Sequence, residues 1–379
     1  MLVLANVLNR QRRRAGGGGG GSQVPVNTSP PTITRNGLVL TCDPGDWDNS
    51  PTLTYRWTLN GTGVVGATSA TWSPPASAWG ALFNCEVVGT NAAGAGLPAL
   101  AQAVYIGILD VLGAPIIASS FRKLGSAHVS AASIRSFATN PAEQDKDIGF
   151  TSTGELDTAL LMSHIGSGDG YVHTFRHALG NTTFDGTQAI GSKQPRLASA
   201  GVIDVLNGKP TMKFSGAQCL EFVNFRPDRT AYPELTVSIV YQCEDLTPLK
   251  AFWGAENGGF DRLQVFGWGA GIPDFGVSTG NSGVAQPAMN TTNAAVYTAV
   301  FRTGVANGSY VAINNVPGTP FTEVVGSDHN IFTIGSLNPG QGFMIGKIAE
   351  VLVFPRAFST AEQSLMGRNQ GARYGITVA

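Results

Sequence analysis

The sequence predicts an all-β protein with a flexible N-terminal arm at residues 1–24, a first β-sandwich at 25–104 and a larger one at 105–379. Three observations support this prediction. Glycine is abundant, with 49 of 379 residues, and recurs with Asn and Pro in turns. Val, Thr and Phe are frequent between those turns, while the runs of Glu and Lys that favour helices are missing. Charged residues are only 13% of the chain, which indicates that much surface is hidden in packed sheets or in an assembly.

The arm combines an apolar stub with basic residues and a glycine run. Six glycines from Gly16 to Gly21 form a flexible tether. An apolar and basic segment on such a tether is typical of a docking peptide that becomes ordered on binding a partner, and a disordered tail is the alternative. The residues expected to dock onto a particle are Leu2, Leu4, Leu8, Arg10, Arg12, Arg13 and Arg14.

Charge and hydropathy argue against several classes of partner. The net charge of -1 gives no reason to expect nucleic-acid binding. No apolar run approaches the ~20 residues that span a bilayer, so no membrane insertion is expected. In residues 1–14 the basic charges follow the apolar patch, whereas a secretory signal has the reverse order, so no export signal is expected.

Alternating apolar and polar residues around Cys42, Trp57 and Cys85 predict the core of the first domain. The order and spacing of these three residues resemble the Ig-like modules of bacterial surface proteins and of phage head or tail proteins. Phe83 stands where a tyrosine corner requires Tyr, so membership of a strict antibody-type family is not expected. No cysteine belongs to a CxxC pair, which argues against zinc. The sequence does not decide whether Cys42 and Cys85, or Cys219 and Cys243, form disulfides.

The end of the second domain, residues 346–376, has a distinctive pattern. An apolar strand from Ile348 to Phe354 is followed by a proline, an amphipathic segment that opens at Ser359, and a Tyr-Gly pair at Tyr374. This pattern resembles the closing strand and helix of the laminin-G/concanavalin-A-like jelly-roll family. The resemblance implies a jelly-roll sandwich that presents a surface to a sugar or a protein.

A second set of motifs lies in the first half of this domain. They are SFRKL at 120–124, DIGF at 147–150, GELD at 154–157, QPRL at 194–197 and NGKP at 207–210. Together, over residues 109–225, they are similar to the catalytic-domain family of α-L-arabinofuranosidase B and its non-enzymatic relatives in phage tail proteins. That family usually carries Tyr-Asp-Gln-Ser-Gly before its Gln-Pro motif, but residues 174–181 here read TFRHALGN. The departure argues against carrying over glycosidase activity.

Catalytic residues are not apparent from the sequence. A retaining glycosidase needs two carboxyl groups about 5 Å apart, and no two acids can be paired from sequence. Glu155 and Asp157 would share a face on a strand, and capping a helix is the alternative. His173 and His177 would suit a metal only on a helix, and their surroundings predict a strand, so no metal is expected. The candidate acids are Glu155, Asp157, Asp169, Glu221, Glu256, Asp261 and Asp274.

Glycan binding is expected in the loop-rich, aromatic stretch that begins near residue 251. Sugars bind through aromatic faces and a few polar groups, although core packing is the alternative for each tryptophan. Calcium at Glu256, Asn257 and Asp261 is a weaker expectation, and no other cofactor is indicated. The expected glycan-binding residues are Trp253, Glu256, Asn257, Asp261 and Trp268.

These resemblances imply a structural component of a tailed-phage virion: a head decoration, a head fibre or a tail-associated protein. The arm would attach it to other virion proteins, and the jelly roll would contact host cell-surface glycan or sister copies, so a homo-oligomer is expected. One alternative is a glycoside hydrolase, arabinofuranosidase-like, that acts on host polysaccharide. Another is an exported bacterial adhesin or lectin, which the lack of a recognisable signal disfavours.

Overall fold

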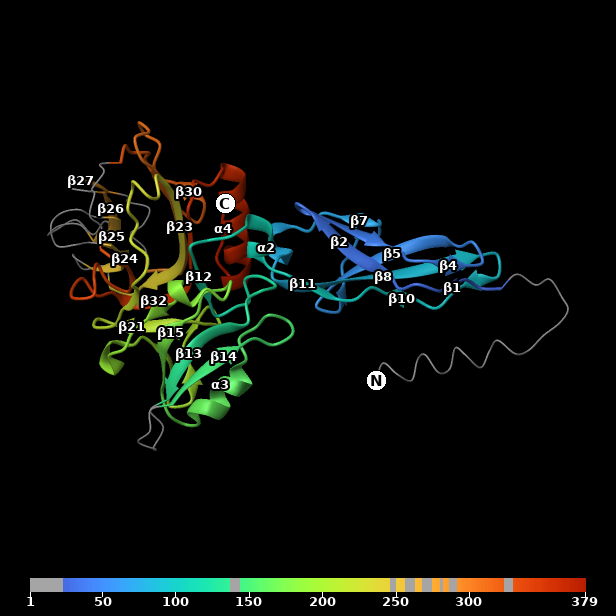
Figure 1. The fold of residues 1–379 in the computed structure, drawn as a ribbon, viewed down its shortest axis with the longest axis horizontal. Coiled ribbons are helices and arrows are strands. Elements are labelled where there is room, and N and C mark those ends of the chain that lie inside the picture. The colour runs from blue at the N-terminus through green and yellow to red at the C-terminus, as the bar shows by residue number, and fades with distance from the viewer. Residues whose placement is uncertain are drawn as a thin grey trace. The chain divides into compact units, whose positions relative to one another are not determined.

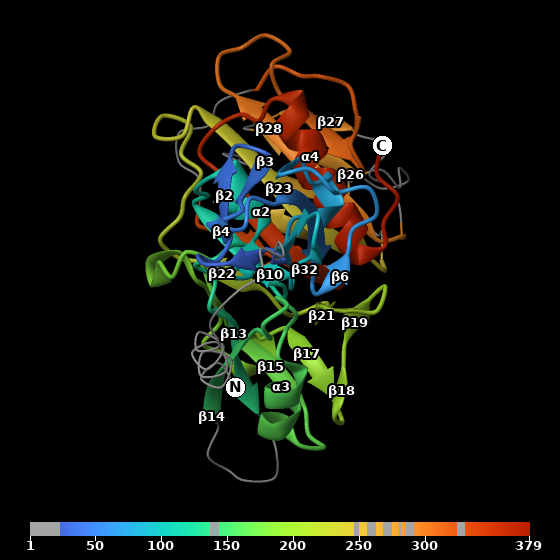
Figure 2. The same cartoon turned by 90° about the vertical axis from the view of Figure 1, so that its right-hand side faces the viewer.

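The computed structural model describes residues 23–136, 144–245, 250–255, 263–267, 275–279, 282–285, 292–323 and 330–379. Antiparallel strands dominate this part of the chain, as Figures 1 and 2 show, and the predicted all-β fold class is confirmed. The docking residues of the arm lie outside the described residues. The chain forms two compact units: unit 1 comprises Met1–Trp72 and Asn84–Ala103, and unit 2 comprises Ser73–Phe83 and Val104–Ala379.

Unit 1 is built from short antiparallel strands in separate small sheets. One sheet has the order β2-β3-β7, and a second is centred on β8 and β5. The strands are β1 Val26–Asn27, β2 Thr32–Asn36, β3 Val39–Asp43, β4 Trp47–Asp48, β5 Thr52–Leu59, β6 Thr62–Gly63, β7 Thr71–Trp72, β8 Ala81–Asn91, β9 Gly94–Ala95 and β10 Ala99–Leu100.

The core of unit 1 contains the three residues that the sequence placed there. Cys42, Trp57 and Cys85 are at most 2% exposed. The Trp57 indole donates a hydrogen bond to the Ser69 carbonyl at 2.9 Å, which satisfies its one polar group. The Cys42 and Cys85 side chains are free thiols, and a hydrogen bond between them lowers the pKa of Cys42 and raises that of Cys85. Trp57 also packs on Trp72 with ring centroids 5.8 Å apart.

Unit 2 contains one continuous, closed set of strand pairings. Strand β32 is central, since it pairs with β12, β21 and β23. The strands are β11 Val104–Ile106, β12 Ile117–Ser120, β13 Ser130–Ser136, β14 Gln144–Gly149, β15 Gly170–Phe175, β16 Gly186–Thr187, β17 Arg196–Ser199, β18 Val202–Ile203, β19 Val205–Leu206, β20 Lys209–Pro210, β21 Met212–Ser215, β22 Leu220–Phe222, β23 Glu234–Cys243, β24 Ala251–Gly254, β25 Leu263–Gly267, β26 Phe275–Thr279, β27 Ser282–Ala285, β28 Ala295–Arg302, β29 Tyr310–Ile313, β30 Val316–Pro317, β31 Phe332–Ile334 and β32 Ile345–Phe354.

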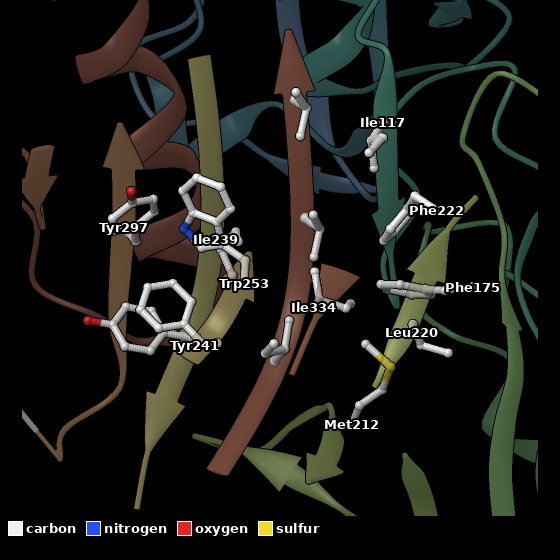
Figure 3. Close-up of a cluster of buried hydrophobic side chains, with 14 of the residues drawn as sticks. Ile117, Phe175, Met212, Leu220, Phe222, Ile239, Tyr241, Trp253, Tyr297 and Ile334 are labelled. Carbon is white, nitrogen blue, oxygen red and sulfur yellow. The ribbon is translucent and has the colours of Figure 1, made fainter. Parts of the chain in front are cut away.

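The core of unit 2 is apolar and rich in aromatic rings (Figure 3). Alternate residues of each strand point inward, as the two-residue period of a strand requires. Trp253 is fully buried and stacks on Phe332 at a centroid distance of 5.5 Å, and Tyr241 stacks on Phe252 at 4.2 Å. Such rings supply a large share of the burial free energy of a sandwich core.

Helices are few in the described chain and short except for the last. Helix α4 begins with a capping box, in which the Ser359 hydroxyl and the Glu362 carboxylate bond each other's backbone N–H groups. It ends at Gly375, which has the left-handed φ of 62°. The predicted opening at Ser359 and closing at Tyr374 match this helix. The helical segments are η1 Ala76–Ala78, α2 Ile108–Leu112, α3 Thr158–Ile165, η2 Thr182–Phe184, η3 Gly191–Lys193 and α4 Thr360–Tyr374, and none in the described chain is long and apolar enough to cross a membrane.

A buried ionic network joins α4 to the central strand. The Arg122 guanidinium binds Glu350 in a bidentate pair, with N–O distances of 2.6 and 2.9 Å. Ser120 and Gln370 also donate to the same carboxylate, at 2.9 and 3.1 Å. Burial opposes the charge of Glu350, but Arg122 and the hydrogen bonds hold its pKa below the usual value. We call Ser120, Arg122, Glu350 and Gln370 the Glu350 network.

Helix α4 also binds a segment that the sequence interpretation assigned to the first domain. The Asn369 side chain donates to the carbonyls of Ala76 and Trp79, at 2.8 and 2.7 Å. Residues 81–83 pair with β11. Residues 73–83 therefore belong to unit 2, although a segment of unit 1, Asn84–Ala103, separates them in sequence from the rest of unit 2.

Candidate functional site

A group of polar side chains lies on the outer face of the sheet formed by β16, β22, β31 and β24. In β22, Leu220 and Phe222 point into the core, so Glu221 between them points outward. Glu221 is in register with Thr187 on one side and with Thr333 on the other. The strand pairing thus gathers residues that are far apart in the chain.

One glutamine side chain bonds this carboxylate, and a second glutamine bonds the backbone of the first. The Gln188 amide donates to Glu221 Oε1 and to the Cys219 carbonyl, both at 3.3 Å. Gln194 in turn donates to the Gln188 carbonyl at 2.8 Å. Gln188 and Gln194 are 3% and 0% exposed, so their amides are rigidly placed. We call Gln188, Gln194, Cys219, Glu221, Thr333 and Ser336 the Glu221 cluster.

Thr333 joins the cluster to the end of β24. Its hydroxyl oxygen lies 3.1 Å from the Gly254 carbonyl and 3.0 Å from the Ser336 carbonyl. A Cβ on Gly254 would come within 2.3 Å of the Leu337 carbonyl oxygen, so only glycine fits at this crossing.

The electrostatics of the cluster keep its thiol protonated. Burial raises the pKa of Cys219, and the negative charge of Glu221 raises it further. The Lys193 charge, the nearby Ser336 and the Gln188 amide, which donates to Cys219 Sγ at 3.3 Å, act in the opposite direction but do not cancel these effects. The Lys193 ammonium itself bonds the Pro339 carbonyl at 3.3 Å. Cys219 is therefore a weak hydrogen-bonding group at neutral pH and a poor nucleophile.

Two buried oxygens of the cluster, Gln194 Oε1 and Ser336 Oγ, have no hydrogen-bond partner within the described ranges. Both residues are 0% exposed. A buried amide oxygen without a partner is costly and uncommon in folded proteins. Glu221 is the one member of the cluster that is partly exposed, since the other five are at most 3% exposed, so its carboxylate is the group that a sugar hydroxyl could reach.

The candidate acids that the structure describes elsewhere have structural contacts. Asp157 caps α3 by accepting from the Leu160 N–H at 2.9 Å, which confirms the capping interpretation. Glu155 does not cap a helix; it pairs with Arg373 at 2.6 Å and with Lys209 at 3.7 Å. Asp169 accepts from the Ala200 N–H at 2.7 Å. Glu256, Asp261 and Asp274 lie outside the described residues.

Among the predicted glycan-binding residues, only Trp253 falls in the described chain, and that prediction is corrected. Trp253 is 0% exposed and packs among aromatic rings, so it has no free face on which a sugar could stack. Glu256, Asn257, Asp261 and Trp268 lie outside the described residues, and so does the proposed calcium set of Glu256, Asn257 and Asp261.

The two histidines considered for a metal do not lie on a helix. His173 is on β15 and its Nδ1 is 3.3 Å from an Asp145 carboxylate oxygen. His177 follows that strand, and its backbone N–H donates to Asp185 at 2.7 Å. In the described ranges no group of three or more His, Cys, Asp or Glu side chains is arranged to hold a metal ion.

The sequence interpretation missed the Glu221 cluster, apart from naming Glu221 as one of several acids. The alternation Leu220-Glu221-Phe222 was a usable signal, since it places a carboxylate on the outer face of a buried strand. Gln188, Gln194 and Ser336 carried no such signal, because only the pairing of distant strands brings them to Glu221.

Comparison with solved structures identifies relatives of the fold. GH54 α-L-arabinofuranosidase soaked with a cyclic sulfate inhibitor matches with a TM-score of 0.52 at 13% identity, over 70% of this chain and 64% of that one. A mutant of the same enzyme soaked with 4-nitrophenyl α-L-arabinofuranoside matches at 0.53 and 13%, with the same coverage. Arabinofuranosidase complexed with arabinofuranosyl-α-1,2-xylobiose matches at 0.52 and 12%, again with the same coverage.

These likenesses show a shared β-sandwich fold, and at such identities they show the fold alone. The chain spans somewhat less than two thirds of the length of these enzymes. No family model matches the sequence, and no curated protein matches it.

Proposed function

We propose that this protein is a structural component of a tailed-phage virion whose jelly-roll unit binds a host surface glycan through the Glu221 cluster. The observation that carries the glycan part is one outward, partly exposed carboxylate, Glu221, which the buried Gln188 amide holds in place on a fold shared with sugar-processing enzymes. Among the candidate acids of the described ranges, Glu155, Asp157 and Asp169 are engaged in structural contacts, which supports binding rather than hydrolysis.

The virion part of the proposal rests on the modular sequence. A basic and apolar stub on six glycines suits attachment to a larger particle, and unit 1, as an Ig-like module, would act as a spacer. Repeated copies on a particle would turn weak sugar contacts into firm adhesion, so we expect a homo-oligomeric display. The proposed location is the virion, as a head decoration, head fibre or tail-associated protein.

Mass spectrometry of purified phage particles tests the virion proposal. Tens to hundreds of copies relative to the major capsid protein would indicate a decoration, and a handful a fibre or tail component. Deletion of residues 1–21 should abolish incorporation and leave the folded units intact. Absence of the full chain from particles would overturn the virion proposal and favour a free lectin or adhesin.

A glycan array probed with the full chain tests the sugar proposal. Glu221→Gln should lose binding, because an amide cannot replace a carboxylate as a double acceptor of hydroxyl hydrogens. Glu244→Gln is the matched control, since Glu244 is a partly exposed acid paired with Lys213 away from the cluster. Equal binding by the two variants would show that Glu221 does not contact the sugar.

The second candidate function is a glycoside hydrolase, which the fold likeness to arabinofuranosidases favours. Glu221 would need a second carboxylate about 5 Å away, and Glu256 is one of the acids named from the sequence that lie outside the described residues. Hydrolysis of 4-nitrophenyl α-L-arabinofuranoside that is lost in both Glu221→Gln and Glu256→Gln would establish this function. Sugar binding without hydrolysis would support the recognition proposal.

A further inference from the structure

Two buried histidines of unit 2 lie in loops that lead into strands, and one of these strands pairs with the strand of Glu221. His128 is 1% exposed and His177 is 5% exposed. His128 belongs to the loop of residues 124–130, which leads into β13, and His177 to the loop of residues 177–185, which leads into β16. Strand β16 carries Thr187, the register partner of Glu221.

Each imidazole is fixed in its neutral form by a backbone donor. The Leu124 N–H donates to His128 Nδ1 at 3.1 Å, and the Leu179 N–H donates to His177 Nδ1 at 3.3 Å. A backbone N–H can only donate, so neither Nδ1 carries a proton and each ring has its proton on Nε2. Protonation of Nδ1 would break these bonds and leave a buried N–H facing another N–H.

The surroundings of His128 oppose a positive charge. Its ring packs edge-on against Phe150, with centroids 4.5 Å apart. Burial lowers the pKa of His128 to about 3; the Ser130 backbone opposes this, and the smaller effects of His177 and Lys123 lower the pKa further. The Lys123 ammonium lies over the Tyr105 ring, 4.8 Å from its centroid, so it is held in this region.

The surroundings of His177 are more mixed. Its ring is near that of Phe184, at 6.2 Å. Burial lowers its pKa, while Asp185 and the Ile116 backbone act in the opposite direction. Asp185 is itself occupied, since it accepts from the His177 N–H at 2.7 Å and from Arg176 at 2.9 Å. Arg176 also pairs with Asp147 at 2.9 Å.

We propose that protonation of His128 and His177 at acid pH opens the 124–130 and 177–185 loops, and that this opening disassembles the Glu221 cluster. The second loop ends at Asp185, directly before β16 and Gln188, so its release frees the Thr187–Glu221 pairing and the Gln188 contact. The opening does not depend on the proposed glycan function, whereas loss of glycan binding at acid pH does.

The direction of the pH effect follows from the lowered pKa values. In the open loops the two imidazoles have the ordinary histidine pKa of about 6.5. Below that pH the open state therefore binds protons that the closed state does not bind. The closed state is fully favoured above about pH 6.5 and loses stability as the pH falls. Between pH 7.5 and 5.0 the open population should rise roughly 30-fold for each histidine that stays neutral when closed.

Hydrogen exchange of the full chain tests this proposal at pH 7.5, 6.0 and 5.0, with rates corrected for the pH dependence of intrinsic exchange. We expect faster exchange at low pH in residues 124–130 and 177–187, ahead of the core strands. His128→Asn with His177→Asn should abolish this increase, because the asparagine oxygen accepts the same backbone hydrogen and does not titrate. His164→Gln is the control, since it removes an imidazole that bonds the Ile134 carbonyl away from this pair.

Unchanged exchange in these loops at pH 5.0, or an equal increase in the double variant, would overturn the proposal. If the double variant does not fold, NMR titration of the native imidazoles decides. Both imidazoles should titrate below the ordinary histidine value of about 6.5, and titration of either at that value would overturn the proposal. Loop opening without loss of glycan binding would leave the acid response standing and remove the Glu221 cluster from the proposed function.

Discussion

Unit 2 contains two groups of buried polar side chains that differ in how completely they are bonded. In the Glu350 network the carboxylate receives two bonds from Arg122 and one each from Ser120 and Gln370. In the Glu221 cluster the carboxylate receives one long bond from Gln188, and Gln194 Oε1 has no partner within the described ranges. A saturated network fixes architecture, whereas an unsaturated one has groups available for a ligand.

The largest effect that tests this comparison is expected at the Glu350 network. Glu350→Gln leaves the buried Arg122 charge without its partner, so the free energy of unfolding of unit 2 should fall by about 3–5 kcal/mol. Chemical denaturation monitored by circular dichroism measures the change. The control is Glu86→Gln, whose partner Arg56 has a 58% exposed side chain. That loss should stay below about 1 kcal/mol, and a similar loss in both variants would contradict the comparison.

The apolar core of unit 2 should show the next largest effect on stability. Trp253→Ala should lower the free energy of unfolding by about 3–5 kcal/mol, because it empties a fully buried site. Val65→Ala, at a fully exposed position, should change it by less than about 0.5 kcal/mol. Thermal and denaturant unfolding measure both. Loss of glycan binding by Trp253→Ala with unchanged stability would restore Trp253 as a sugar-stacking residue.

The helix that carries Gln370 provides a smaller effect. Ser359→Ala removes the hydroxyl that accepts from the Glu362 N–H, and we expect a loss of about 1 kcal/mol in unfolding free energy. Ser359→Asp keeps an acceptor and should retain most of that stability. A loss as large in Ser359→Asp as in Ser359→Ala would show that something other than the cap is responsible.

The smallest effect on stability is expected at the Glu221 cluster. Glu221→Gln should change the free energy of unfolding by less than about 0.5 kcal/mol, because Glu221 is partly exposed and weakly bonded. Its glycan affinity, measured by calorimetry with a ligand found on the array, should fall by about 1.5–3 kcal/mol, the contribution of a charged hydrogen bond. A large loss of stability with unchanged glycan affinity would show that Glu221, like Glu350, has a structural role and does not bind the ligand.

The sequence was sufficient for features that depend on neighbouring residues. Composition and alternation predicted the all-β fold, the Ser359 signal predicted where α4 begins, and Asp157 had the capping role that its position suggested. Each of these depends on contacts within a few positions, which local chemistry determines.

Features that depend on distant contacts could not be predicted. Glu350 meets Arg122 across 228 positions, and nothing near either residue in sequence indicates the other. The placement of residues 73–83 in unit 2 depends on Asn369, which is almost 300 residues away. Trp253 was assigned to a sugar because aromatic residues serve both roles, and only its burial distinguishes them.

The central position of β32 has a consequence for how the protein is made. Its partner β12 leaves the ribosome first. The hydrogen bond from Ser120 to Glu350 cannot form until Glu350, 230 residues later, has been synthesised. At elongation rates of about 5–20 residues per second, this delay is roughly 10–50 s. Until β32 is made, β12 and later β21 and β23 keep the unpaired backbone edges that the last strand will cover. Nascent chains of this protein therefore need shielding from one another, and premature termination before residue 345 releases an unfinished sandwich that is prone to aggregate.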